Sequence, residues 1–481
     1  MSPLSTPRFT RQTLLVAFSV FALGAAACAP NGPDGPAPTA RTLPAAQDAA
    51  PTTQQPADAA DSAPEADVFR TTLRAQRVEG PNGLQYGYNG LNPGPTLRVP
   101  LGASVEIELI NELDVPTTIH WHGLHVPFPM DGVVWMGAPV EPGETFTYRF
   151  TADQPGTFWY HPHVDTARQV DAGLYGAFVV EDPFEAEAME AVANDWVFVL
   201  DSIDEWSEEG AHPVHGHGRV VRRWQVNAVE AGEVLVGAGE VIRARLVNAA
   251  NHGTAAVEPV LVQADGSEAP ASWAQIGSDQ GLLASARSPD RVLLASGDRA
   301  EVLFSLGEGE SLRLEAAGYS LNGGDTGWPA APLVTFRAEG GGSASALPAF
   351  PHVARAPTAD PGHTDILYAF AGTDRTDEWY INGEQFPNVT IETIPAGAPR
   401  VLEFRNLSSS EHPLHIHGMS FEVLSVNGVA PDEYTLEDTW NLAIRDIVRV
   451  RVETTNRGDW MTHCHILEHA EAGMMTVLRV E

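Results

Sequence analysis

The stretch that decides the fold runs from residue 463 to residue 474 and reads HCHILEHAEAGM. It places the imidazole of His469 five residues after the thiol of Cys464, and the thioether of Met474 ten residues after that thiol. Two His, one Cys and a weak axial Met are the ligand types of a blue-copper site. On an extended strand, the two neighbours of Cys464 point to the opposite face from its sulfur. Both neighbours are His, so the pattern predicts a second metal site behind the first.

Three other stretches alternate histidine with another residue. They read HWHG at residues 120–123, HPH at 161–163 and HPLHIHG at 412–418. With the closing stretch they bring together ten His, one Cys and one Met as candidate ligands. A single His-x-His pair is more often structural than metal-binding. Four such motifs in this order, one of them enclosing a Cys, are hard to explain by chance.

These motifs resemble the four copper signatures of the multicopper oxidases, the laccase-like family. The resemblance spans about residues 68–481 and is weakest in the middle. It implies an all-β chain of three cupredoxin-like Greek-key β-sandwich domains. It also implies an enzyme with four copper ions, one of type 1, one of type 2 and two of type 3. Such an enzyme couples the one-electron oxidation of a donor to the four-electron reduction of dioxygen to water.

The resemblance assigns a role to each motif residue. The type 1 copper would take His412, Cys464, His469 and Met474, while Met475 falls one residue beyond the family spacing. The other ligands would be His120 and His415 for type 2, His122, His161 and His465 for one type 3 copper, and His163, His417 and His463 for the other. Electrons would pass from Cys464 through His463 and His465, so these three residues are expected to be catalytic.

Two acidic positions are candidates for proton transfer. Asp131 follows His120 at the distance where the family carries an acid near the cluster, so we expect it to relay protons. The segment 130–132 also fits a plain turn. Bacterial relatives often place a second acid directly after the last type 1 His, but here that residue is Ala470. Glu471 follows, and it either replaces the missing acid or only caps the local structure.

An internal repeat divides the globular part of the chain. Strand-like runs lie between a Gly and an Asn at equal spacing, at residues 102–111, 239–248 and 397–406. Further β-rich segments bounded by Gly and Pro turns lie at 145–150, 197–200 and 447–450. The three copies predict three similar β-sandwich domains, at residues 68–183, 184–345 and 346–481.

The first and third copies of the repeat agree beyond the strand. Each leads at the same interval to a His-x-His-Gly motif, and Pro162 later occupies the place of Cys464. The middle copy has Val257 and Pro259 at the equivalent positions. The first domain should therefore hold half of the trinuclear site, and the third domain the type 1 copper with the other half. The middle domain should hold no ligand.

Composition limits the partners. The chain has 481 residues, 43% of them hydrophobic, which is enough for about three cored domains. It carries 63 acidic and 28 basic residues, a net charge of -35. Such a charge argues against nucleic acid or an anionic membrane surface as a partner. We expect a monomer whose partners are a small-molecule donor and dioxygen.

Residues 1–28 have the features of an export signal. Two arginines precede an apolar run at 14–27 that is too short for a convincing membrane span. Cys28 resembles a bacterial lipoprotein cleavage site, which would make it a lipid attachment point and a membrane tether. Ala25 stands where such sites usually carry Leu, so plain cleavage nearby is the alternative. Residues 29–67 are rich in Ala and Pro and predict a disordered tether. The mature protein is expected in the periplasm, anchored to the cell envelope, or secreted.

The remaining histidines are better explained as residues that bind no catalytic metal. The stretch 212–218 reads HPVHGHG and mimics the third-domain motif, but it lacks the preceding repeat strand. We interpret it as a solvated loop, with loose copper binding as the alternative. His125, His252, His352 and His363 show no partner pattern and are expected to be structural or exposed.

The identity of the donor is the least determined feature. Copper-efflux oxidases often carry a Met-rich lid, because thioethers prefer Cu(I). This chain has 8 Met, scattered along its length. We therefore expect a laccase-like enzyme that oxidises phenols or aromatic amines at the exposed edge of a type 1 His. The alternatives are a periplasmic cuprous oxidase for copper tolerance and a non-catalytic scaffold of the same fold.

Overall fold

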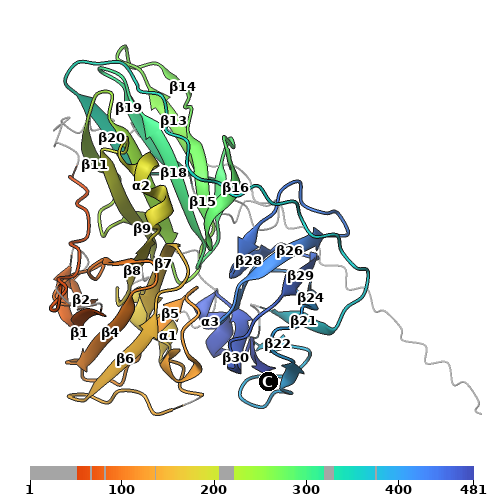
Figure 1. Ribbon diagram of the computed structural model, residues 1–481. Coiled ribbons are helices and arrows are strands. Elements are labelled where there is room, and N and C mark those ends of the chain that lie inside the picture. The colour runs from red at the N-terminus through yellow and green to blue at the C-terminus, as the bar shows by residue number, and fades with distance from the viewer. Residues whose placement is uncertain are drawn as a thin grey trace, which may run out of the picture. The chain divides into compact units, whose positions relative to one another are not determined.

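The computed structural model describes residues 51–64, 68–80, 83–135, 137–204, 222–318, 330–373, 376 and 378–481. The expected export signal with Cys28 and the histidine-rich loop at 212–218 lie outside these residues. In the described part, strands dominate and the helices are short (Figure 1). None of those helices has the length and apolar character needed to cross a membrane. The prediction of an all-β chain is confirmed.

The first two sheets come from residues 68–181. Their strand orders are β2-β1-β4-β6 and β3-β8-β7-β5. The strands are β1 (Val68–Gly80), β2 (Gly83–Tyr88), β3 (Leu97–Pro100), β4 (Ser104–Asn111), β5 (His120–His122), β6 (Thr145–Thr151), β7 (Gly156–His161) and β8 (Gly176–Glu181). Their inner faces form one core, in which the ring of Trp121 packs against Tyr148 and Phe178.

The second pair of sheets comes from residues 194–339, with orders β10-β9-β12-β18-β15-β16 and β11-β20-β19-β13-β14. The strands are β9 (Asn194–Asp204), β10 (Arg222–Val226), β11 (Gly232–Gly237), β12 (Val241–Asn248), β13 (Ala255–Val262), β14 (Glu268–Pro270), β15 (Ala274–Ser278), β16 (Gly281–Arg287), β17 (Val292–Leu294), β18 (Arg299–Ser305), β19 (Ser311–Ala317) and β20 (Ala331–Glu339). β17 pairs with β13 beside this path. Phe336 packs against Phe198 and Phe304 in the core between the sheets.

The third pair comes from residues 366–480, with orders β22-β21-β24-β29-β26-β27 and β23-β31-β30-β25-β28. The strands are β21 (Ile366–Thr373), β22 (Glu378–Ile381), β23 (Glu392–Ile394), β24 (Arg400–Asn406), β25 (His412–Ile416), β26 (Phe421–Val426), β27 (Leu436–Glu437), β28 (Thr439–Leu442), β29 (Ile447–Val452), β30 (Gly458–Cys464) and β31 (Met475–Val480). Its core includes Tyr368, Phe370 and Phe404, and also Cys464.

The repeated Gly has the same conformation in each pair of sheets. The repeat strands are β4, β12 and β24, and each lies between two neighbours in its sheet. The Gly before each strand has positive φ, at 85° in Gly102, 87° in Gly239 and 70° in Gly397. Glycine adopts this conformation without the steric cost of a Cβ. The repeat therefore marks a tight turn into a central strand.

The repeated Asn closes the loop after each repeat strand. Its side-chain amide donates to at least two backbone carbonyls, those of Val115 and Val140 for Asn111, Gly253 and Leu294 for Asn248, and Ser410, Leu442 and Ala443 for Asn406. All three side chains are buried. In the first and third pairs of sheets the closed loop leads into a histidine strand. The equal spacing from Asn to His therefore reflects a shared loop geometry.

Residues 51–64 differ from the disordered tether that their composition predicts. Thr52 forms a backbone bridge with Glu233 in the second pair of sheets, and Asp58 forms one with Thr96 in the first pair. The side chain of Gln55 accepts a hydrogen bond from the amide of Val197. The segment is therefore ordered by backbone pairing with distant parts of the chain. Its own composition does not predict this pairing.

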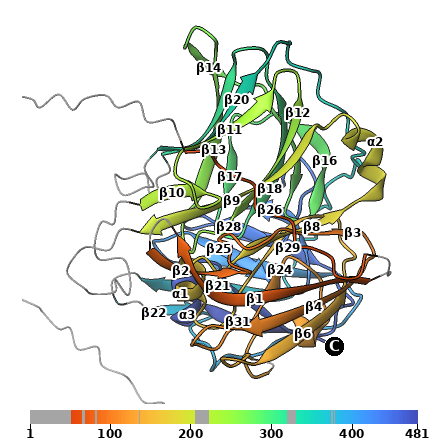
Figure 2. The ribbon, with the colours of Figure 1, turned by 90° about the vertical axis from the view of Figure 1, so that its left-hand side faces the viewer.

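The first and third pairs of sheets meet along their histidine strands. β5 pairs with β7 so that His120 lies opposite His161, and β25 pairs with β30 so that His415 lies opposite His463. The helix α1 (Thr166–Asp171) follows β7 and contacts α3 (Leu467–Glu471), which follows β30. Figure 2 shows these two helices side by side. All four histidine-bearing strands therefore converge on one place.

Candidate metal centre

Three ligand-type side chains form a triangle at the end of β30. The Sγ atom of Cys464 lies 3.4 Å from Nδ1 of His412 and 3.7 Å from Nδ1 of His469, and the two nitrogens are 3.3 Å apart. A metal at the centre of such a plane, with bonds of about 2.0–2.3 Å, gives sides of about 3.5–4 Å. The spacing therefore fits one metal ion bound by two imidazoles and a thiolate.

Neighbouring groups fix the orientation of each side chain in the triangle. Nε2 of His412 lies 2.7 Å from the hydroxyl of Ser408, which leaves Nδ1 facing the sulfur. The ring of His469 stacks on Trp379 with centroids 3.7 Å apart. The amide of Ile466 donates to Sγ of Cys464 at 3.4 Å. Burial raises the pKa of the Cys464 thiol well above its usual value. The thiolate therefore needs a positive charge beside it, which a bound metal ion would supply.

Met474 and Met475 point into different surroundings. Met474 is completely buried in the same core as Cys464, its carbonyl accepts from the Cys464 amide, and its own amide donates to the His469 carbonyl. Met475 lies opposite His463 in the pairing of β30 with β31, and it lines a cavity on the other side of that strand. The arrangement favours Met474 over Met475 as the axial residue of the triangle.

Eight histidines gather behind the triangle. They form three groups, each with one nitrogen per residue within 4.8 Å of the others: His120, His122 and His415; His122, His161 and His465; and His163, His417 and His463. Each group draws on both the first and the third pair of sheets. The structure thus brings together every histidine that the motifs single out for the trinuclear cluster.

Hydrogen bonds at Nδ1 orient most of these rings. Nδ1 of His120, His161, His415 and His463 lies 3.0, 2.9, 2.9 and 2.8 Å from a backbone carbonyl oxygen. A carbonyl only accepts, so Nδ1 carries the proton and the lone pair of Nε2 faces inward. This is the usual arrangement of a histidine that binds a metal.

Several inward nitrogens have no protein partner. Among the described residues, the buried ring atoms without a hydrogen-bond partner include Nε2 of His120, His161 and His415, Nδ1 of His122, and both ring nitrogens of His465. Buried polar atoms are almost always satisfied in native proteins. Lone pairs that converge without donors are what a metal cluster would satisfy, so the residues present fit bound copper ions.

The cluster favours neutral imidazoles. Burial, reinforced by the neighbouring rings, holds the pKa of five residues well below the usual value: His122, His161, His163, His417 and His465. The same causes lower the pKa of His463 to about 3. A neutral imidazole is the form that binds metals. The packed rings are therefore ready to bind metal at neutral pH.

Two carboxylates hold these rings from outside, and only one was predicted. Asp131 is completely buried, with Oδ1 3.1 Å from Nδ1 of His120 and Oδ2 2.8 Å from Nδ1 of His417. Asp438 was missed. Its Oδ1 lies 3.0 Å from Nε2 of His122 and 3.5 Å from Nδ1 of His415. The only sequence signal for Asp438 is an acidic pair just before β28, and its role depends on the pairing of β28 with β25.

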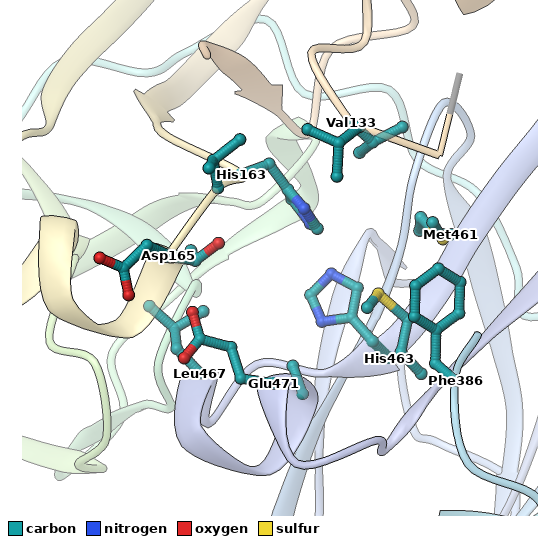
Figure 3. Close-up of a pocket in the computed structure, with 13 residues that line it drawn as sticks. Val133, His163, Asp165, Phe386, Met461, His463, Leu467 and Glu471 are labelled. Carbon is teal, nitrogen blue, oxygen red and sulfur yellow. The ribbon is translucent and has the colours of Figure 1, made fainter. Parts of the chain in front are cut away.

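Glu471 both caps a helix and faces a cavity. Its Oε1 accepts from the amide of Ala167 in the first turn of α1, across the boundary between the two pairs of sheets. Burial raises the pKa of Glu471. The cavity of about 180 Å³ is also lined by His163 and His463 (Figure 3). The capping role is thus present, and the replacement of the missing acid stays a prediction.

The four unassigned histidines lie outside the histidine groups. His125 is largely buried, and burial lowers its pKa to about 4. Nδ1 of His352 lies 2.9 Å from the carbonyl of Leu283. The carbonyl of His252 accepts from Ser202, and His363 is exposed. None of them belongs to a candidate metal group in the described part of the chain.

Comparison with known proteins agrees with this site. Two multicopper oxidase family models match the chain, one over residues 72–185 and the other over residues 358–481. A multicopper oxidase of Mycobacterium tuberculosis is 28% identical over 98% of this chain and 96% of its own length. One of Staphylococcus epidermidis is 29% identical over 82% of this chain and 83% of its own. The crystal structure of a laccase from Pediococcus acidilactici is 28% identical, with a TM-score of 0.75 over 89% of this chain and 93% of its own.

The chain belongs to the multicopper oxidase family. It is an oxidoreductase of that kind, which uses copper and dioxygen. The family and enzyme class predicted from the motifs are therefore confirmed.

Proposed function

We propose that this protein is a laccase-like oxidase that takes single electrons from phenols or aromatic amines and reduces dioxygen to water. Its type 1 copper would be held by His412, Cys464, His469 and Met474, and its trinuclear cluster by the eight grouped histidines, four copper ions in all. Copper, when bound, supplies the one-electron redox steps that this reaction needs. Because dioxygen needs four electrons to reach water, several such ions must act together.

One observation carries the proposal: Cys464 belongs to the triangle while both its neighbours belong to the histidine groups. His463 lies in one group and His465 in another. In addition, Nδ1 of His463 lies 2.8 Å from the carbonyl oxygen of Cys464. The chain thus joins the two sites through one residue of backbone and one hydrogen bond.

The surroundings of the triangle bear on the donor. His412 is completely buried and His469 is 7% exposed. The sequence predicted an openly exposed edge on a type 1 His, and this prediction is wrong because both rings are buried. Ser408 and Trp379 contact these two rings. Met474 and Met419 lie in the same buried core as Cys464. Met461 and Met475 instead line the cavity beside His463. The methionines of the sequence are scattered along its length, which supports an organic donor that passes electrons to the edge of His469.

Oxidation of Cu(I) is the second candidate, and negative charge favours it. The carboxylates of Glu411, which is buried, and Glu468, which is half-buried, belong to the sequence neighbours of His412 and His469. Thr254 donates to Glu411 at 2.6 Å, and Asn251 donates to Glu468 at 3.0 Å. Two acids beside the triangle would attract a cationic donor.

Turnover of a dimethoxyphenol against turnover of Cu(I), both followed by oxygen consumption on copper-loaded protein, separates the two candidates. We expect the larger kcat/KM for the phenol. A strong preference for Cu(I) would replace the proposed donor while leaving the oxidase assignment in place. Copper-loaded protein that consumes no oxygen with either donor would contradict the proposed function itself.

Substitution of Met474 by leucine is expected to raise the reduction potential of the type 1 copper. A thioether stabilises the oxidised ion as a weak fourth ligand, and leucine cannot replace it. Met475→Leu is the matched control and should leave the potential unchanged. A redox titration of the visible absorption band measures both variants. The axial assignment is reversed if only the control shifts.

A further inference from the structure

The middle pair of sheets lies against the histidine groups without adding a residue to them. Its turn between β17 and β18 contains Gly297, whose φ is 96°. A Cβ built on Gly297 would lie 3.1 Å from Cε1 of His122 and 3.2 Å from Cδ2 of His465. The backbone of this turn is thus in close contact with two rings. The next residue, Asp298, leads directly into Arg299, the first residue of β18.

The side chain of Arg299 is completely buried, and all of its N–H donors are hydrogen-bonded. A guanidinium group has five N–H donors. They contact the carbonyls of Thr157, Gly297 and Asp279 and both carboxylate oxygens of Asp438. Thr157 belongs to the first pair of sheets, Gly297 and Asp279 to the second, and Asp438 to the third. One side chain therefore joins all three pairs of sheets beside the cluster.

Asp438, held by Arg299, in turn fixes the orientation of the His122 ring. Its Oδ1 lies 3.0 Å from Nε2 of His122, and the hydroxyl of Thr439 lies 3.1 Å from the same nitrogen. Nε2 is therefore the protonated nitrogen, and Nδ1 is the buried one without a protein partner. This is the reverse of the rings whose Nδ1 faces a backbone carbonyl. His122 needs the opposite tautomer, and a fixed carboxylate supplies the acceptor for it.

We propose that Arg299 and Asp438 are a positioning pair through which the middle domain holds His122 with Nδ1 directed at the trinuclear cluster. The inference rests on the proposed function, because it assumes copper at the histidine groups. It also explains the glycine that follows His122. A Cβ at Gly123 would lie 2.5 Å from a terminal nitrogen of Arg299 and 2.7 Å from Oδ2 of Asp438.

The geometry requires a carboxylate and not an amide at position 438. Oδ1 receives the His122 ring N–H, Arg299 and the Thr439 hydroxyl. Oδ2 receives Arg299 and the side chain of Gln280, the latter at 2.6 Å. In asparagine, one of the two oxygens becomes an NH2 group, which would face another N–H donor in either orientation of the amide. Asp438→Asn therefore breaks either the contact with the histidine or the contact with the arginine.

The test is removal of copper by a competing chelator, read by copper content per chain, visible absorption and electron paramagnetic resonance. In Asp438→Asn and Arg299→Lys, we expect the trinuclear copper to be lost at chelator concentrations about 10- to 100-fold lower than in the wild type. The type 1 absorption should persist in both. Arg299→Lys serves as the second variant if Asp438→Asn does not fold, because lysine keeps the charge but not the paired contacts.

Glu301→Gln is the matched control. Glu301 is also a completely buried carboxylate in ion pairs with arginines, Arg243 and Arg245, and it belongs to none of the histidine groups. The Glu301→Gln protein should be less stable to unfolding, but the chelator concentration that removes copper from the cluster should not change. The inference is overturned if the variants at 438 and 299 match the wild type, or if Glu301→Gln loses cluster copper equally. Wild-type protein that binds only the type 1 copper would overturn the proposed function, and the inference with it.

Discussion

Replacement of Cys464 by serine is expected to abolish the intense visible absorption and reduce donor oxidation to background. The sulfur is the only thiol ligand of the triangle and the start of the link to His463 and His465. A serine hydroxyl gives no polarizable, covalent bond to copper. Copper content should fall by the one type 1 ion, since the eight histidines of the cluster bind independently of the sulfur. Absorption spectra and metal analysis of the same sample measure both effects.

Reoxidation of the reduced enzyme supplies the control for this variant. A chemically reduced Cys464→Ser protein should still consume dioxygen once, because the histidine groups remain intact. Retention of the visible band, or loss of all copper together, would contradict the separation of the two sites.

Replacement of Asp131 by asparagine should lower turnover by about 10- to 100-fold, the usual cost of removing a group that orients metal ligands. Both carboxylate oxygens contact Nδ1 of a cluster histidine, His120 on one side and His417 on the other. An amide can accept only one of these N–H groups. If Asp131 also delivers protons, the loss should grow as the pH rises and free protons become scarce.

The measurement is kcat as a function of pH, together with the copper content of each sample. An equal loss of kcat at every pH would mean that Asp131 orients the histidines but does not deliver protons. Unchanged turnover and an unchanged pH profile would remove both roles. Asp131→Glu, which keeps the carboxylate, is the comparison that separates lost charge from lost shape.

Much of the site could be predicted because its residues sit in local patterns. Each His-x-His pair lies on or at the end of a short strand, and alternation on a strand sends both side chains to one face. The order of the motifs then distributes them between the first and third pairs of sheets. The repeat of Gly and Asn predicted the central strands β4, β12 and β24 because a turn and a loop closure flank each of them.

What the sequence could not predict depends on contacts between distant segments. Asp438 orients His122 across more than three hundred positions of the chain. Arg299 comes from a domain that carries no ligand motif, so no spacing rule reaches it. The order of residues 51–64 arises from single backbone bridges to two different pairs of sheets. Burial of the type 1 histidines likewise follows from Ser408 and Trp379, whose contacts are not encoded in any motif.

The most direct test of the whole account is the copper content of purified, metal-reconstituted protein, measured together with its visible spectrum. Three histidine groups and one Cys–His triangle predict four copper ions per chain and an intense absorption band in the orange-red. Fewer than four coppers with no such band would contradict it.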